Sequence, residues 1–198
     1  MKKVLFGIMA LSVAAFAVNP GTGTPETASV PVKVIAEIIK APTGLTITDE
    51  AGTVLDELLI DHGRIVADTA GDDSVAFKIF KVKRFDSTGA IDILNPTDTA
   101  GAKLKASLDN ADTTLALNGD PTVSKLESTL TLTGGTNPID EISYEHIVAT
   151  GEKEHVGRVT SRIARSELYA ATNTGGSLET GIHHNSRERT LTVVYTPN

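Results

Sequence analysis

Apolar and polar residues alternate in short segments along most of this chain, and residues that favour turns separate these segments. The strongest alternation spans residues 75–85, where Phe77 and Ile79 would lie on one side of an extended chain and Phe80 and Val82 on the other. A period of two is the spacing of a β-strand, and apolar residues on both sides indicate a central strand. Short strands with Gly, Pro, Asn and Asp between them, at intervals of roughly 8–12 residues, predict an all-β sandwich or barrel.

The segments expected to form strands share this alternation or a short apolar run between turn residues. They span residues 29–39, 45–48, 54–60, 64–67, 75–85, 103–108, 114–117, 127–133, 142–149 and 190–195. Residues 54–60 give the most ambiguous pattern, because an apolar run interrupted by Asp56 and Glu57 fits a short helix as well as a strand.

Residues 152–171 carry a different pattern and predict the one helix of the chain. A helix would place four apolar residues on one face, namely Val156, Val159, Ile163 and Ala170. It would place four polar or aromatic residues on the other face, namely Arg158, Arg162, Arg165 and Tyr169. The arginine row is most simply a solvated helix face, with an acidic partner as the alternative.

The N-terminus is typical of an export signal. Lys2 and Lys3 precede an apolar run over residues 4–14, and residues 15–17, Ala-Phe-Ala, offer a cleavage site. We therefore expect a bacterial-type signal peptide at residues 1–17 and export through the inner membrane. Because the apolar run is too short to span a bilayer, we expect no membrane span in the mature form.

The rest of the chain divides by composition into three parts. Residues 18–28 are rich in Gly, Thr and Pro and are expected to form a flexible leader. Residues 29–39 are expected to form the first strand, and residues 40–198 are expected to fold as one β-sandwich domain. A mature chain of about 180 residues can bury enough surface for one stable domain without a metal or a disulfide.

Composition excludes several classes of function. The 198 residues include no cysteine, which removes thiol catalysis, disulfides and cysteine-ligated metals. The net charge of −7 argues against nucleic acid or an anionic membrane as a partner.

No motif predicts catalysis, a cofactor or a metal site. His183 and His184 are adjacent, so in an extended chain they point to opposite faces and cannot share one ion. The acidic residues Asp72, Asp73 and Asp109 are more typical of turns than of a calcium loop, whose pattern is absent. We therefore expect that the protein is not an enzyme.

The segment at residues 29–39 gives the most specific functional indication. Five small or apolar residues fall on one side of this segment, namely Val30, Val32, Val34, Ala36 and Ile38. Together with a cysteine-free all-β body and a C-terminal strand that ends near Tyr195, this segment resembles the pilin subunits of chaperone–usher fimbriae. The resemblance is to the cysteine-free, colonisation-factor type of major subunit.

The resemblance implies an immunoglobulin-like sandwich that lacks one strand. In that family a periplasmic chaperone fills the gap first, and the N-terminal extension of the next identical subunit then replaces it. The five residues named above would be the inserted residues, and Leu191, Val193 and Tyr195 would line the last strand beside the groove, where chaperone and usher recognition act. The product would be a fimbria on the cell surface that adheres to a host or cell-surface receptor.

Two other interpretations stay open. Residues 29–39 could be an ordinary first strand of a complete sandwich, in which case the protein would be a monomeric module that binds a glycan or protein ligand at the cell surface. A sugar site usually needs exposed aromatic rings, and this chain has no Trp and only 4% aromatic residues. An enzyme that uses paired carboxylates is the third and least favoured alternative.

Overall fold

The structure is a computed structural model, and it describes residues 18–22, 27–29, 43–98, 100–134 and 141–198. The chain divides into two compact units, residues 1–40 and residues 41–198. No helix within the described residues is long and apolar enough to cross a membrane.

The first unit contains one short hairpin. Strand β1 (Val18–Thr22) pairs antiparallel with β2 (Thr27–Ser29). These two strands lie largely within the segment for which sequence alone predicts a flexible leader. The proposed inserted residues, Val30, Val32, Val34, Ala36 and Ile38, lie outside the described residues.

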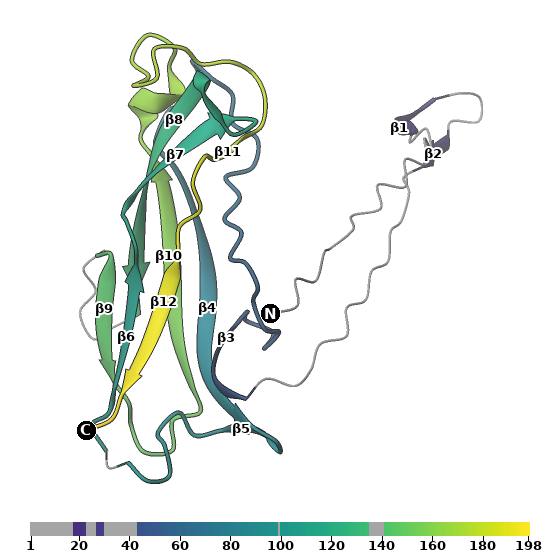
Figure 1. Cartoon of the computed structure of the whole chain (residues 1–198). Coiled ribbons are helices and arrows are strands. Elements are labelled where there is room, and N and C mark those ends of the chain that lie inside the picture. The colour runs from purple at the N-terminus through teal and green to yellow at the C-terminus, as the bar shows by residue number, and fades with distance from the viewer. Residues whose placement is uncertain (1–17, 23–26, 30–42, 99, 135–140) are drawn as a thin grey trace, which may run out of the picture. The chain divides into compact units, whose positions relative to one another are not determined.

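The second unit contains two antiparallel sheets (Figure 1). The larger sheet follows the order β11-β7-β8-β10-β4-β3, with β5 paired to β4. Its strands are β3 (Gly44–Thr48), β4 (Ser74–Asp86), β5 (Gly89–Ile91), β7 (Asp112–Leu117), β8 (Asp120–Thr133), β10 (Glu154–Ile163) and β11 (His183–Asn185). The smaller sheet follows the order β12-β6-β9, with β6 (Lys103–Leu108), β9 (Ser143–Ile147) and β12 (Leu191–Thr196).

The inner faces of the two sheets form one hydrophobic core. Leu104 and Ala106 of β6 pack with Phe80 of β4, Leu132 of β8 and Val159 of β10. The alternation predicted from the sequence places these side chains inward, since residues two apart in a strand share a face. The all-β sandwich expected from the sequence is confirmed.

Strand β4 is an interior strand, as its apolar residues on both sides predict. It lies between β10 and β3, and its Phe80 and Val82 are fully buried. The segments expected at residues 45–48, 103–108, 114–117, 127–133, 142–149 and 190–195 correspond to β3, β6, β7, β8, β9 and β12.

The helix predicted at residues 152–171 is wrong. The structure has β10 at Glu154–Ile163, followed by a 3₁₀ turn, η1, at Arg165–Leu168. Every second residue of β10 is buried, including Gly157 and Ser161. Because Gly157 has no side chain and Ser161 has a small polar one, a hydropathy pattern does not reveal the period of two. Ladders to β4 on one side and β8 on the other satisfy the backbone of the strand, which decides its conformation.

Gly157 shows why β10 needs a small residue at its centre. A Cβ atom placed there would lie 2.5 Å from the Tyr144 hydroxyl and closer still to the ring of Phe80. We expect Gly157→Ala to lower the free energy of unfolding by about 1–3 kcal/mol, because the packed ring of Phe80 must shift.

Gly71→Ala is the matched control, since nothing lies within 4 Å of its added Cβ atom. Its effect on the free energy of unfolding should stay within about 0.5 kcal/mol. Denaturant titrations of both variants beside the wild type measure these differences. Equal stability of the two variants would contradict the packing described for β10.

Candidate functional site

A large groove with apolar and polar walls lies in the second unit. Its volume is about 1670 Å³, which exceeds the roughly 300–1,000 Å³ of a typical small-molecule pocket. Its floor includes Leu108 of β6, Leu126 and Leu130 of β8, and Val159 of β10. Its walls are residues 55–67, the segment at residues 178–190, which includes β11, and the first residue of β12.

Residues 55–67 form one wall of the groove without forming a strand. The strands predicted at residues 54–60 and 64–67 are therefore wrong, and only an isolated bridge between Thr48 and Val54 remains. Leu55, Leu58 and Ile60 still pack against the hydrophobic core. Their uneven spacing around Asp56 and Glu57 breaks the period of two that a strand needs.

The backbone of this wall lacks the hydrogen bonds of a sheet. Leu55 donates to the carbonyl of Ile47 at 3.1 Å, and Asp68 donates to the carbonyl of Leu168 at 2.9 Å. Between these two points, the described part of the chain shows no backbone–backbone hydrogen bond to residues 56–67. Among the residues that the structure describes, the wall thus has the apolar contacts of a strand but no ladder.

His62 fastens the middle of the wall to the larger sheet. Its Nδ1 atom lies 2.9 Å from the Ser74 hydroxyl, and its Nε2 atom lies 2.8 Å from the Ser161 hydroxyl. The Ser161 hydroxyl also contacts the buried hydroxyl of Ser128 at 2.6 Å. Burial lowers the pKa of His62 below 6.5, and the charge of Asp61 opposes this shift in part.

Strand β12 forms an edge of the smaller sheet next to the groove. It pairs with β6 from Leu191 to Thr196, and no described strand pairs with its other edge (Figure 1). Leu191, Val193 and Tyr195 are half-buried and pack against the core, whereas Val194 points outward. An edge strand of this kind presents unpaired N–H and C=O groups.

The three residues of β12 that were predicted to lie beside the groove do not all line it. Leu191 lines the groove, whereas Val193 and Tyr195 lie farther along β12 and do not line it. The Tyr195 hydroxyl donates to the Asp98 carboxylate at 2.7 Å and accepts from the backbone N–H of Asn95 at 3.2 Å. Tyr195 therefore holds the end of β12 against the turn at residues 95–98.

The rim of the groove carries the most exposed large apolar side chains of the described residues. Ile182 is 76% exposed, Leu59 is 67% exposed and Val66 is 65% exposed, and all three line the groove. Apolar side chains gathered around a hollow are typical of a surface that contacts another protein.

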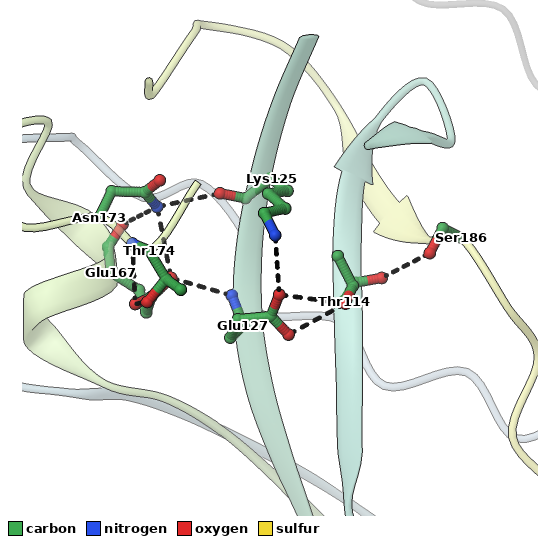
Figure 2. Close-up of polar contacts among 7 residues, drawn as sticks. All are labelled: Thr114, Lys125, Glu127, Glu167, Asn173, Thr174 and Ser186. Carbon is green, nitrogen blue, oxygen red and sulfur yellow. Dashed lines mark hydrogen bonds and ion pairs between the residues drawn. The ribbon is translucent and has the colours of Figure 1, made fainter. Parts of the chain in front are cut away.

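The buried carboxylate of Glu167 stabilises the end of the sandwich next to the groove wall at residues 178–190 (Figure 2). Glu167 of η1 accepts hydrogen bonds from the backbone N–H of Glu127 at 3.1 Å and from the backbone N–H and the hydroxyl of Thr174. Asn173 donates to the carbonyls of Lys125 and Glu167, each at 2.9 Å. These contacts attach η1 and the loop that follows it to β8.

The same set of contacts continues across the sheet to the loop after β11 (Figure 2). The Thr114 hydroxyl donates to both carboxylate oxygens of Glu127, at 3.1 and 3.0 Å, and Lys125 lies 3.7 Å from that carboxylate. The backbone N–H of Ser186 then donates to the carbonyl of Thr114 at 3.0 Å. Polar contacts therefore anchor the chain at Thr174, before the groove wall at residues 178–190, and at Ser186 within it.

No protein-family model matches the sequence, and no curated protein is similar enough to count as a relative. The resemblance to fimbrial subunits accordingly stays a prediction that rests on the residues themselves.

Sequence analysis missed most of the groove. Strands were expected at residues 54–60 and 64–67, and Ile182 is a single apolar residue in a polar, Gly-containing loop. The one available signal was the irregular apolar spacing around Asp56 and Glu57, which a strand does not explain.

The pH dependence of stability tests the role of His62. Because the pKa of His62 is below 6.5 in the folded protein, the unfolded chain binds more protons as the pH falls. The contribution of His62 to the free energy of unfolding is therefore complete above about pH 6.5 and decreases as the pH falls below that value. Denaturant titrations at several pH values should show this loss.

His62→Gln is the control, because it keeps a hydrogen-bonding side chain but does not titrate. All other groups titrate alike in the two proteins. Any difference between the slopes of their unfolding free energies against pH is therefore due to His62. The variant should lose less stability than the wild type over this interval. Identical slopes would contradict the burial of this ring.

Proposed function

We propose that this protein is a structural, pilin-like subunit that polymerises by strand exchange, with residues 29–39 of one copy entering the groove of the next. The polymer would be a fimbria at the cell surface, and adhesion would be its function. The observation that carries the proposal is the groove of about 1670 Å³ that lies beside residues 55–67 and reaches Leu191 at the start of β12.

The backbone groups around the groove favour an extended ligand. One edge of β12 is without a strand partner among the described residues, and residues 56–67 form no ladder there. A strand laid beside β12 would pair those N–H and C=O groups, as in other cases where a peptide adds to a sheet edge. A small compound would not supply such a row of partners.

The side chains of residues 29–39 suit the interior of such a groove. In an extended chain, Val30, Val32, Val34, Ala36 and Ile38 would share one face. Burial of each larger apolar side chain contributes about 1.5–3 kcal/mol. Several such contributions, together with a new ladder, would give very slow dissociation between subunits.

The proposal implies further partners during assembly. An open groove exposes apolar surface, which favours aggregation before the next subunit arrives. A periplasmic chaperone and an outer-membrane usher would cover this surface in turn, and the finished fibre would contact a host or cell-surface receptor.

A second candidate function uses the same groove differently. The exposed apolar rim, with Ile182, Leu59 and Val66, also suits a monomer that binds an extended protein ligand at the cell surface. Such a monomer would not form a ladder of multiples on a gel.

The experiment is an SDS gel of surface-extracted protein, run with and without boiling. We expect the unboiled wild type to give a ladder of multiples that collapses to the monomer on boiling. Val34→Asp should abolish the ladder, because it places a charge on the face that enters the groove. Lys33→Asp is the matched control on the opposite face, and its ladder should persist.

Leu191→Asp tests the groove from the other side. Leu191 lines the groove, whereas the neighbouring Thr192 is exposed, so Thr192→Asp serves as its control. Circular dichroism of the monomers verifies that each variant is folded. A monomer band in every lane of the wild type would contradict polymerisation and favour the second candidate.

A further inference from the structure

Three side chains that bind metals in other proteins converge where β9 leads into β10. His146 lies on β9, Glu152 lies in the turn and His155 lies on β10. One ligand atom from each lies within 4.8 Å of the other two. The cluster joins the smaller sheet, which contains β9, to the larger sheet, which contains β10.

The turn between the strands positions the carboxylate of Glu152. Gly151 has a φ of 80°, and the N–H of Glu152 donates to the carbonyl of Ala149 at 3.2 Å. One oxygen of Glu152 accepts from the N–H of Ala149 at 2.9 Å. Its other oxygen is thereby directed toward the two histidines.

The distances suit a small divalent ion after minor adjustment. The Glu152 Oε1 atom lies 2.8 Å from His146 Nε2 and 3.9 Å from His155 Nδ1. Ligands placed about 2.0–2.1 Å from a tetrahedral Zn²⁺ lie roughly 3.3 Å apart, which falls between these two distances. Two imidazoles and a carboxylate form a typical ligand set for Zn²⁺.

The contacts of His155 leave its Nδ1 atom available as a metal ligand. Its Nε2 atom lies 3.0 Å from the Tyr144 hydroxyl, so that a proton on Nε2 leaves the lone pair on Nδ1 facing Glu152. No hydrogen bond to Nδ1 is found among the described residues, although the ring is only 6% exposed.

The two histidine rings stack, with their centroids 4.0 Å apart. The His146 Nε2–H donates to Glu152 Oε1 at 2.8 Å, so a cation that binds here would replace that proton.

We propose that His146 Nε2, Glu152 Oε1 and His155 Nδ1 bind one Zn²⁺-like transition-metal ion that connects the two sheets. The ion would act as a structural cross-link in a chain that has no cysteine. This inference does not rest on strand exchange, because none of its residues lines the groove.

The test is a titration of the purified, chelator-treated chain with ZnCl₂ by isothermal calorimetry, near neutral pH. We expect one Zn²⁺ per chain and a melting temperature that rises with Zn²⁺ concentration. His146→Ala and Glu152→Gln should each weaken binding at least tenfold. His184→Ala is the matched control, because His184 is exposed on β11, and its affinity should equal that of the wild type.

Long-range ¹H–¹⁵N spectra of the histidine rings give a second measurement on the wild type, independent of any variant. The signals of His146 Nε2 and His155 Nδ1 should shift on addition of Zn²⁺, whereas those of His62 should not. Absence of binding, unchanged affinity in His146→Ala, or weaker affinity in His184→Ala would each overturn the proposal and leave a hydrogen-bonded cluster without metal.

Discussion

Backbone pairing at one side of the sandwich is the constraint on which the rest of this structure depends. Buried or half-buried N–H and C=O groups need partners, yet β12 has one edge without a strand and residues 56–67 have no ladder within the described chain. Leu55, Leu58 and Ile60 cover part of the core at this side. Within the described residues, apolar burial at this side is thus not accompanied by the hydrogen bonds of a sheet, and the groove lies beside it.

Polar contacts compensate for the missing ladder at a few fixed points. His62 holds the middle of one wall through the hydroxyls of Ser74 and Ser161. Glu167 holds η1 and its loop through the backbone of Glu127 and through Thr174. Hydrogen bonds to a buried charge contribute more than those between neutral groups, about 1.5–3 kcal/mol each. A frame fixed in this way can keep a groove open without a ligand.

The two ends of the sandwich are held by different chemistry. Near the groove wall at residues 178–190, carboxylate and amide contacts join η1, β8 and β7. At the β9–β10 turn, His146, Glu152 and His155 bring the two sheets together, and the proposed ion would add a cross-link there. Both arrangements use side chains in a role that disulfides fill in many exported proteins.

Sequence patterns predicted the parts of the fold in which alternation and burial agree. Phe80 and Val82 made β4 recognisable as a central strand, and the all-β class followed from such segments. Strand β10 was predicted to be a helix, because the burial of Gly157 depends on Phe80 and Tyr144, and that of Ser161 involves His62 and Ser128, all from other elements. The groove was missed for the same reason, since its walls are set by tertiary contacts of His62 and Glu167 that no local pattern encodes.

Hydrogen–deuterium exchange along β12 tests the central claim most directly. The purified full chain would be incubated with a synthetic peptide of residues 29–39, and with the same peptide carrying Val34→Asp as the control. The account predicts that amide exchange slows in Leu191–Thr196 with the first peptide alone, because a new strand pairs with this edge. Unchanged exchange in β12, or equal protection by both peptides, would contradict it.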